Sequence, residues 1–206
     1  MVLDEFNILI TAVGGQGGLT LSRIIASAAL KEGYNVRIGE TLGMSQRGGA
    51  VMSFVRFGRK VYSPLFSEGE ADILIGLEPV ETLRRIEYTS EKTFLLMNTQ
   101  PIKPVPTNLG IETYPEIERI IKYIDRFVRK KIITNFFERT IKIGSPRVMN
   151  VLMLGTIVGA EKLPIKEDNI KKAIEEIVPK KALDINLKAF TEGKRIGSSE
   201  NIIGNA

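Results

Sequence analysis

A strand that runs directly into clustered glycines and then into a helix is the feature that most restricts the fold of this chain. Residues Phe6–Val13 form an apolar run rich in Ile, Val and Thr, which is typical of a strand buried on both faces. Four glycines follow within residues 14–18. Apolar side chains at helical spacing come next, and Gly33 is well placed to end this helix. A second strand is expected at Val36–Ile38, so the sequence predicts the opening of a βαβ fold.

Further short apolar segments indicate more strands. We expect strands at Ile73–Leu77 and Phe94–Met97, and a hairpin in which Val51–Phe57 pairs with Lys60–Tyr62 around a turn at Gly58. Strands that alternate with helices build three-layer domains. The predicted class is therefore α/β, with three α/β/α layers, a mostly parallel sheet and an added β-hairpin.

Helices are expected between and after these strands, each marked by a start signal or by apolar residues at a period near that of the α-helix. The expected helices are Pro79–Glu87, Ile117–Val128, Pro146–Ala160, Lys166–Ile177 and Leu183–Phe190. No linker-like break in composition separates these segments. We therefore expect residues 1–193 to form a single domain and residues 194–206 to form a flexible tail.

The chain contains neither cysteine nor histidine. It therefore supplies no thiolate to an iron–sulfur cluster or a structural zinc, and it lacks the commonest general base at neutral pH. We expect no metal site and no catalytic residue here, so difficult chemistry is expected on a cofactor or on another chain. No run of 18 uncharged apolar residues occurs and Met1–Thr11 has no basic region, which predicts a cytoplasmic protein that does not enter a membrane.

Basic side chains are concentrated in one stretch, Arg119–Arg147, where nine Lys or Arg residues face two acids, Asp125 and Glu138. Such a stretch attracts nucleic acid, phosphates or an acidic partner, or it forms the solvated face of a helix. No aromatic interleaving or recognition motif accompanies it, so nucleic acid is not expected as a partner.

The glycine motif is a candidate site for an anion. Glycine permits unusual backbone angles and close approach of a ligand, and the helix N-terminus that follows attracts phosphate. The alternative is a tight turn that serves only the packing of helix on strand. The dinucleotide fingerprint is incomplete, because Thr20 stands where a third Gly or Ala is needed, although Glu40 lies where a ribose-binding acid is expected. The candidate residues are Gly14, Gly15, Gln16, Gly17 and Gly18.

A second motif, Glu40–Ala50, follows the second strand and is expected beside the glycines, because ligands of α/β sheets bind beyond the carboxyl ends of strands. Arg47 can pair with a phosphate or carboxylate through two parallel hydrogen bonds. The alternative is a surface loop with one salt bridge. The candidate residues are Glu40, Gln46, Arg47, Gly48 and Gly49.

Two further carboxylates, Glu78 and Glu81, flank Pro79 at the start of an expected helix. This spacing is compatible with an acid–base pair, and also with a favourable interaction between acids and the helix dipole. The second explanation suffices, so we expect no catalysis from this pair.

Several short segments, spread over residues 6–193, carry a resemblance to a known family. They are Val13–Thr20, Glu40 with Gly43–Gly49, Ala71–Asp72, Gly76–Arg84, Asn150 with Leu154–Gly155, and Asn186–Phe190 with Gly193. Together they resemble the gamma domain of 2-oxoacid:ferredoxin oxidoreductases. Within that family, the segment Gln46–Gly49 most resembles the beta subunit of the indolepyruvate enzyme.

The resemblance implies that this chain is the cluster-free subunit of a larger complex and binds no cofactor alone. The partner alpha subunit is implied to bind thiamine diphosphate with magnesium and to carry iron–sulfur clusters. The complex is implied to convert an aryl 2-oxoacid, such as indole-3-pyruvate, and coenzyme A to an acyl-CoA, carbon dioxide and reduced ferredoxin. The two motifs are then expected to face the alpha subunit's active site or a coenzyme A phosphate.

A function of a different class, a free-standing nucleotide- or flavin-binding module, is also compatible with the glycine motif and Glu40. The first interpretation predicts a subunit that is inactive alone. The second predicts a chain that binds a nucleotide or flavin by itself.

Overall fold

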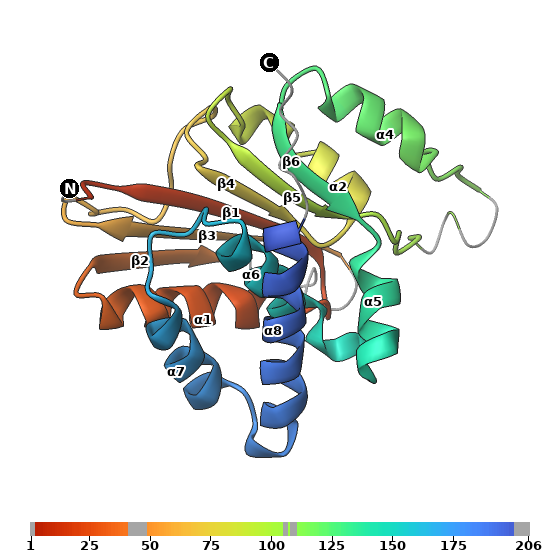
Figure 1. Cartoon of the computed structure of the whole chain (residues 1–206). Helices are drawn as coiled ribbons and strands as arrows, with labels where there is room; N and C mark the ends of the chain where they lie inside the picture. Colours follow the sequence, from red (N-terminus) through yellow and green to blue (C-terminus); the bar gives the residue numbers. More distant parts are fainter. Residues whose placement is uncertain (1–2, 41–48, 105–106, 108–110, 200–206) are drawn as a thin grey trace.

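The computed structural model describes residues 3–40, 49–104, 107 and 111–199. Within these residues six strands form one sheet, in the order β2-β3-β1-β4-β5-β6, with helices on both faces (Figure 1). The strands are β1 (Phe6–Val13), β2 (Asn35–Glu40), β3 (Ala50–Gly58), β4 (Ile73–Gly76), β5 (Phe94–Asn98) and β6 (Lys130–Thr134). The predicted three-layer α/β fold is confirmed.

The strands that position the site are parallel to one another. β1 pairs in parallel with β4, β4 with β5, and β5 with β6. Their carboxyl ends therefore lie at the same edge of the sheet. Val13, Gly76 and Asn98 are the last residues of β1, β4 and β5 at this edge. β3 runs in the opposite direction, so its first residue, Ala50, pairs with Val13 at that edge.

The added hairpin is formed by β2 and β3, and the location expected for it around Gly58 is wrong. β3 is hydrogen-bonded to β1 on one side and, with Glu40 opposite Ser53, to β2 on the other. Both edges of β3 are therefore occupied. Lys60–Tyr62 cannot pair with β3 and forms no strand.

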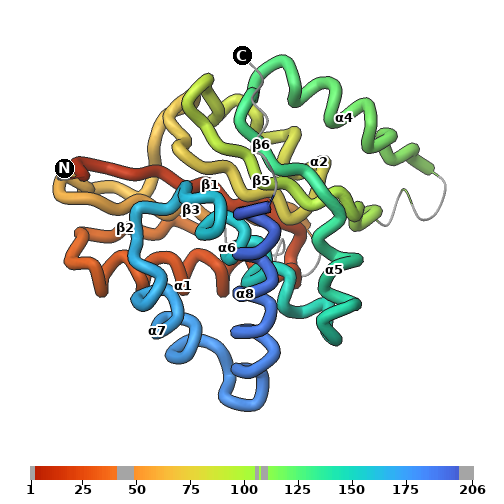
Figure 2. Tube along the Cα trace, viewed as in Figure 1, coloured from red at the N-terminus to blue at the C-terminus, as the bar shows by residue number. Residues whose placement is uncertain are grey.

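The helices cover the two faces of the sheet unequally. The described helices are α1 (Gly18–Lys31), α2 (Pro79–Leu83), α4 (Ile117–Ile124), α5 (Phe136–Ile143), α6 (Met149–Gly159), α7 (Glu167–Ile177) and α8 (Leu183–Ser199). Short 3-10 turns lie at Ile86–Tyr88, Pro146–Val148 and Lys180–Ala182. Figure 2 shows α1, α6, α7 and α8 on one face of the sheet and α2 and α4 on the other.

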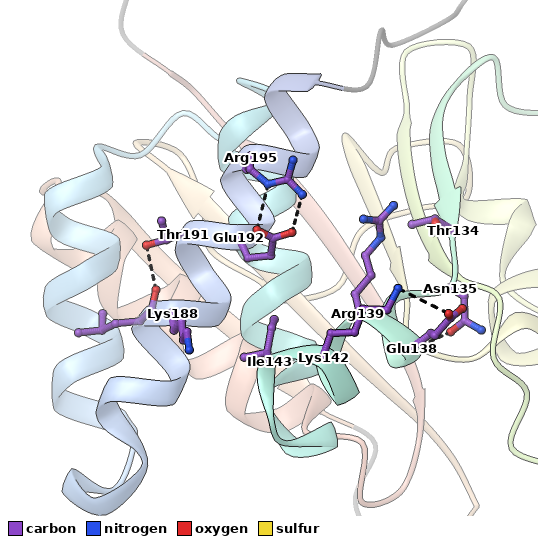
Figure 3. Close-up of a pocket in the computed structure, with 11 residues that line it drawn as sticks. Thr134, Asn135, Glu138, Arg139, Lys142, Ile143, Lys188, Thr191, Glu192 and Arg195 are labelled. Atoms are coloured by element: carbon purple, nitrogen blue, oxygen red, sulfur yellow. Dashed lines mark hydrogen bonds and ion pairs between the residues drawn. The ribbon is translucent and has the colours of Figure 1, made fainter.

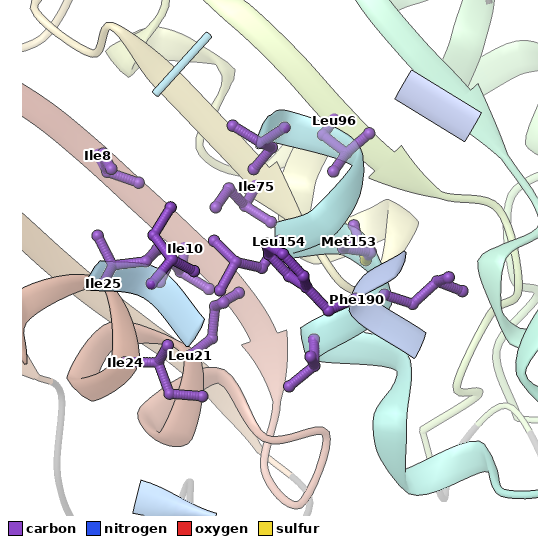
Figure 4. Packing of buried hydrophobic residues seen from close by; sticks show 14 of the residues in the cluster. Ile8, Ile10, Leu21, Ile24, Ile25, Ile75, Leu96, Met153, Leu154 and Phe190 are labelled. Carbon is purple, nitrogen blue, oxygen red and sulfur yellow. The ribbon is translucent and has the colours of Figure 1, made fainter. Parts of the chain in front are cut away.

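The two faces of the sheet form separate hydrophobic cores because successive strand residues point in opposite directions. Ile8 and Ile10 of β1 belong to the core that includes residues of α1, α6 and α8, whereas Leu9 between them belongs to the core on the other face, with residues of α4. In the larger core, Figure 4 shows Leu21 of α1 beside Ile10 of β1, and Phe190 of α8 near Leu154 of α6. Full burial of one such side chain contributes about 1.5–3 kcal/mol, so this core stabilises the sheet against the helix layer.

Four glycines bring α6 and α8 into close contact. Gly155 and Gly159 on α6 face Gly193 and Gly197 on α8, and a Cβ atom added to any of them would meet the backbone of the other helix. α6 is buried over nearly its whole length. This packing fixes the N-terminal end of α6 beside the carboxyl ends of the strands.

The C-terminal segment departs from the expected tail. α8 continues to Ser199, so residues 194–199 are helical, because Ile196 and Gly197 are buried on the face that packs against α6. Residues 200–206 lie outside the described part of the chain. The assignment of residues 1–193 to one domain stays a prediction.

The basic stretch Arg119–Arg147 is not a single helix face. It spans α4, β6 and α5, and the last two were not expected. The expectation that no aromatic side chains are interleaved with the basic ones was also wrong. The guanidinium of Arg126 lies 5.4 Å from the ring centroid of Tyr123 and 6.0 Å from that of Phe127. Among the described residues, none of the helices combines the length and the apolar character that a membrane span requires.

Candidate functional site

The glycine motif forms the turn between β1 and α1, and two of its positions require glycine. Gly15 and Gly17 have φ values of +100° and +84°, in the left-handed region that side chains disfavour. Gly17 is also the N-cap of α1, and a Cβ atom there would lie 2.7 Å from the Nδ2 atom of Asn150. The turn therefore serves packing, and it also presents the N-terminal N–H groups of α1, which have no partners within the helix.

Gln16 braces this turn through its side-chain amide. Its Oε1 accepts a hydrogen bond from the N–H of Val13 at 2.7 Å, and its Nε2 donates to the carbonyl oxygen of Leu77 at 2.9 Å. The amide thereby links the carboxyl ends of β1 and β4. A contact between Gln16 and a ligand stays a prediction.

Two buried asparagines extend the bracing to neighbouring elements. Asn98, the last residue of β5, donates from Nδ2 to the carbonyl of Leu77 at 3.1 Å and accepts at Oδ1 from the N–H of Phe137 at 3.3 Å. Asn150 on α6 donates to the carbonyl of Gly17 at 3.1 Å. Because an unpaired buried amide costs about 1–3 kcal/mol, these bonds hold three strands, α5 and α6 in one arrangement.

A cleft with a volume of about 650 Å³ opens beside the glycine turn, at the carboxyl ends of β1 and β5. This volume lies within the range of small-molecule and cofactor sites, and the position is the one where α/β sheets bind ligands. Its walls include Gly15, Gln16 and Gly17 of the motif, and the amides Asn98, Asn150 and Asn186.

Two cations give the cleft a positive wall. Arg147 comes from the 3-10 turn before α6, where the hydroxyl of Ser145 accepts its backbone N–H at 3.3 Å, and Lys181 comes from the turn before α8. No carboxylate among the described residues lines this cleft. Its charge and its glycine turn therefore suit an anion. We did not expect Arg147 or Lys181 as site residues; the position of Arg147 in the basic stretch was the only signal in the sequence.

Only the ends of the second motif are described. The carbonyl of Gly49 accepts a hydrogen bond from the N–H of Gly14 at 2.9 Å, so the predicted proximity of the two motifs is confirmed at this end. The Oε1 atom of Glu40 accepts from the hydroxyl of Ser22 on α1, also at 2.9 Å. The candidate residues Gln46, Arg47 and Gly48 lie outside the described residues.

The carboxylate pair before and within α2 has a structural role. Glu78, which is 1% exposed, caps α2 by accepting from the N–H of Glu81 at 2.9 Å, and it accepts from the Tyr114 hydroxyl at 2.6 Å. Burial and the adjacent Glu78 raise the pKa of that hydroxyl, so it remains a donor. Burial also raises the pKa of Glu81, although Arg84, at 3.5 Å, opposes the shift.

The residues present distinguish between possible ligands. The sequence contains no cysteine or histidine, and no group of acidic residues in the described part of the chain is arranged to hold a metal ion. The chain therefore does not fit an iron–sulfur cluster. The glycine turn, Arg147 and Lys181 do fit a phosphate-bearing ligand.

The fold and the cleft define an α/β protein with a glycine turn beside a cation-lined cleft. Residues 7–196 match the family described as pyruvate ferredoxin/flavodoxin oxidoreductase, and the chain belongs to this family. The resemblance inferred from the motifs is thereby confirmed. The family is one of 2-oxoacid ferredoxin oxidoreductases.

Relatives with similar sequences match this chain over nearly their whole length. It is 41% identical over 192 residues to indolepyruvate oxidoreductase subunit IorB of Pyrococcus horikoshii, covering 93% of this chain and 95% of that protein. It is also 41% identical over 189 residues to subunit IorB of Archaeoglobus fulgidus, covering 92% and 94%. The common subunit gamma of the pyruvate/ketoisovalerate oxidoreductases of Thermococcus kodakarensis is 25% identical over 181 residues, covering 87% and 90%.

Solved structures with lower identity share the fold. The gamma subunit of a keto/oxoacid ferredoxin oxidoreductase from Geobacter sulfurreducens has a TM-score of 0.66 at 22% identity, covering 95% of this chain and 99% of that chain. The 2-oxoglutarate:ferredoxin oxidoreductase from Magnetococcus marinus, with 2-oxoglutarate, coenzyme A and succinyl-CoA bound, has a TM-score of 0.73 at 18% identity. That match covers 97% of this chain but 32% of the larger chain.

Proposed function

We propose that this chain is the cluster-free subunit of a cytoplasmic 2-oxoacid:ferredoxin oxidoreductase that acts on indole-3-pyruvate or a related aryl 2-oxoacid. The name of the IorB relatives supports the substrate. The chain has no thiolate or imidazole, which supports placing the iron–sulfur clusters in the partner alpha subunit.

The observation that carries this proposal is the cation-lined cleft beside the glycine turn. We assign it the task of holding an anionic group, either a coenzyme A phosphate or the diphosphate of the partner's cofactor. Gly15 and Gly17 let the ligand approach the backbone, and Arg147 and Lys181 balance its charge. Thiamine diphosphate, held with magnesium by the alpha subunit, would supply the decarboxylation chemistry.

The second motif extends this surface in the proposal. The carbonyl of Gly49 accepts a hydrogen bond from the N–H of Gly14, so the described end of this motif lies at the same edge of the sheet as the cleft. We assign Arg47 to pairing with the same anion or with a carboxylate of the alpha subunit, with Gln46 and Gly48 beside it. Arg47→Ala is expected to lower turnover of the complex while the subunit stays folded.

The test is to co-express the chain with the alpha subunit and to isolate the complex by size-exclusion chromatography. Iron–sulfur absorbance should co-elute with the chain, and the complex should reduce ferredoxin when indole-3-pyruvate and coenzyme A are both present. The chain alone should be inactive. An isolated chain that oxidises the acid unaided, or one that never co-elutes with a thiamine-diphosphate protein, contradicts the proposal.

A free-standing nucleotide- or flavin-binding module is the second candidate, because the glycine turn faces a cleft of cofactor size. Against it, Glu40, the acid needed to bind a ribose, is hydrogen-bonded to Ser22. An absorbance spectrum of the purified chain and thermal shifts with NAD, FAD and coenzyme A separate the two. A flavin spectrum, or stabilisation by NAD or FAD, favours the module; stabilisation by coenzyme A alone favours the subunit.

A further inference from the structure

The outer face of α4 combines cations with aromatic rings. Ile120, Ile124 and Val128 point into the core beneath the helix, and the N–H of Val128 still donates to the carbonyl of Ile124 at 3.0 Å, so helical geometry continues past the end of α4. Residues spaced by three and four on the other side therefore share one face that points to solvent. All five of them are exposed, and we call them the α4 patch: Arg119, Lys122, Tyr123, Arg126 and Phe127.

Two aromatic rings form the centre of the α4 patch. The ring centroids of Tyr123 and Phe127 are 5.2 Å apart, and the guanidinium of Arg126 lies over both rings. The two aromatic residues are nevertheless 44% and 42% exposed. Tyrosine, phenylalanine and arginine are residue types that are enriched where proteins bind one another. The composition of the patch is therefore typical of a protein-binding surface.

The cations of the α4 patch are available to a partner. In the part of the chain that the structure describes, Arg119, Lys122 and Arg126 form no ion pair. Asp125, which lies beside the patch, is 3.0 Å from the Nζ atom of Lys131 and is thereby offset. Three unpaired cations around an aromatic centre are complementary in charge to an acidic protein surface.

A hollow of about 840 Å³ between α5 and α8 also carries basic side chains, but carboxylates pair with some of them. Glu192 accepts from the Nε and Nη2 atoms of Arg195 at 3.0 and 2.8 Å (Figure 3), and Glu138 lies 3.8 Å from the Nζ atom of Lys142. The α4 patch contains no acid, so we place the acidic partner there.

The α4 patch and the glycine-turn cleft lie at different edges of the sheet. Asp125, just after α4, contacts Lys131, which pairs with Leu95 near the amino ends of β5 and β6. The cleft lies at the carboxyl ends of the strands, and no described residue of α4 lines it. α4 also covers the face of the sheet opposite α6 and α8 (Figure 1). A protein bound to the α4 patch therefore leaves the cleft free.

The size of the aromatic centre favours a transient contact over a permanent one. From their exposed fractions, the two rings offer roughly 150–200 Å² of apolar surface, whereas permanent subunit interfaces bury about 2,000 Å² or more. Exposed charges mainly steer association and make it depend on salt. A nucleic acid fits less well, because Arg126 already lies over the rings on which bases would stack.

We propose that the α4 patch docks the acidic electron carrier of the complex, the ferredoxin in the description of the family. Carboxylates of the carrier contact the three cations, and its apolar surface covers Tyr123 and Phe127. This chain has no thiolate to hold an iron–sulfur cluster, so it positions the carrier beside the alpha subunit and passes no electrons itself. The inference rests on the proposed function and adds to it a docking surface for the protein substrate.

The test reconstitutes the complex with Lys122→Glu or with Phe127→Ala and supplies the 2-oxoacid and coenzyme A. Reduction of an acidic ferredoxin is compared with reduction of methyl viologen, which is too small to need a docking surface. Lys122→Glu should raise KM for ferredoxin about tenfold at low ionic strength, and less at high ionic strength, because salt screens exposed charges. Phe127→Ala should raise this KM at both ionic strengths. The kcat for ferredoxin and the reduction of methyl viologen should change little.

Lys172→Glu on α7 is the matched control. Both lysines are exposed, and each has one acid four residues before it and another three residues after it: Glu118 and Asp125 for Lys122, and Asp168 and Glu175 for Lys172. The two substitutions therefore make the same change of charge in similar helical surroundings. Lys172→Glu should leave the KM for ferredoxin unchanged.

Three results overturn the docking proposal. The first is an unchanged KM for ferredoxin in both Lys122→Glu and Phe127→Ala. The second is loss of co-elution with the alpha subunit in both variants, which would place the α4 patch at the subunit interface. The third is a single-stranded oligonucleotide that binds the parent complex more tightly than ferredoxin does and loses this binding in Lys122→Glu. A parent complex that reduces neither acceptor contradicts the proposed function itself, and the docking proposal fails with it.

Discussion

The close contact between α6 and α8 predicts that Gly155→Ala destabilises the chain. An added Cβ atom at this position would meet the carbonyl oxygen of Phe190 on α8 and lie 2.9 Å from its carbonyl carbon. Ordinary contact begins at 3.4 Å. The obstacle is helix backbone, which no side-chain rotation can move, so the two helices must separate by at least several tenths of an ångström along a fully buried interface.

Two opposing effects determine how much Gly155→Ala changes the free energy of unfolding. Inserting an extra methyl group into a well-packed core costs about 1–3 kcal/mol, and contact with backbone places this site at the upper end. Replacing glycine by alanine within a helix returns about 1 kcal/mol through helix propensity. The expected loss in the free energy of unfolding is therefore about 2 kcal/mol, or roughly 4–8 °C in Tm for a chain of this length.

Urea denaturation followed by circular dichroism measures this loss as a lower midpoint with an unchanged slope. Thr191→Ala, on the exposed side of the same helix pair, is the control and should change the midpoint little. A Gly155→Ala variant as stable as the parent chain, or more stable, would show that the helix propensity of alanine outweighs the cost of the added methyl group. The inferred backbone contact between α6 and α8 would then be refuted.

Three further predictions concern the residues around the site. Gly17→Ala should lower the free energy of unfolding by about 1–3 kcal/mol, because φ is +84° there and the new Cβ would lie 2.7 Å from Asn150; unchanged urea stability would contradict this. Tyr114→Phe removes the 2.6 Å hydrogen bond to buried Glu78 and should cost about 1.5–3 kcal/mol in the same assay, whereas a neutral result would mean that Glu78 is satisfied without it. Burial raises the pKa of Glu81 above its ordinary 4.5, so the folded state binds the proton more tightly and stability falls as pH rises through the folded pKa. Glu81→Gln should therefore stabilise the chain at neutral pH and lose that advantage in acid; urea midpoints at several pH values test this, and a pH-independent difference would contradict it.

The strand–turn–helix unit could be predicted because its signals are local. The apolar run of β1 and the glycines after it are contiguous, and the left-handed φ values of Gly15 and Gly17 require the residue type that the sequence displays. β6 was missed because it is an edge strand in which lysines precede the apolar residues. In a single sequence such a strand resembles part of a basic helix face.

Part of the candidate site depends on contacts between distant segments, and these leave no local pattern. Asn98 and Lys181 line the cleft beside the glycine turn only because β4 and β5 extend the sheet from β1 and α8 packs on α6. The role of Glu40 at a ligand stays a prediction, and its hydrogen bond to Ser22 on α1 was not indicated by the residue spacing. Likewise Gln16 was expected to face a ligand. The hydrogen bonds of its side-chain amide to Val13 and Leu77 could be found only from the structure.

The most direct test of the account is the steady-state turnover of the complex reconstituted with Arg147→Ala, compared with Lys172→Ala on α7. If Arg147 holds an anion at the interface with the alpha subunit, kcat/KM for coenzyme A or for the 2-oxoacid should fall by about tenfold, while both variants still co-elute with the alpha subunit. The Lys172→Ala complex should behave as the parent. Identical kinetics for both substrates in the two variants would show that the cleft takes no part in the reaction.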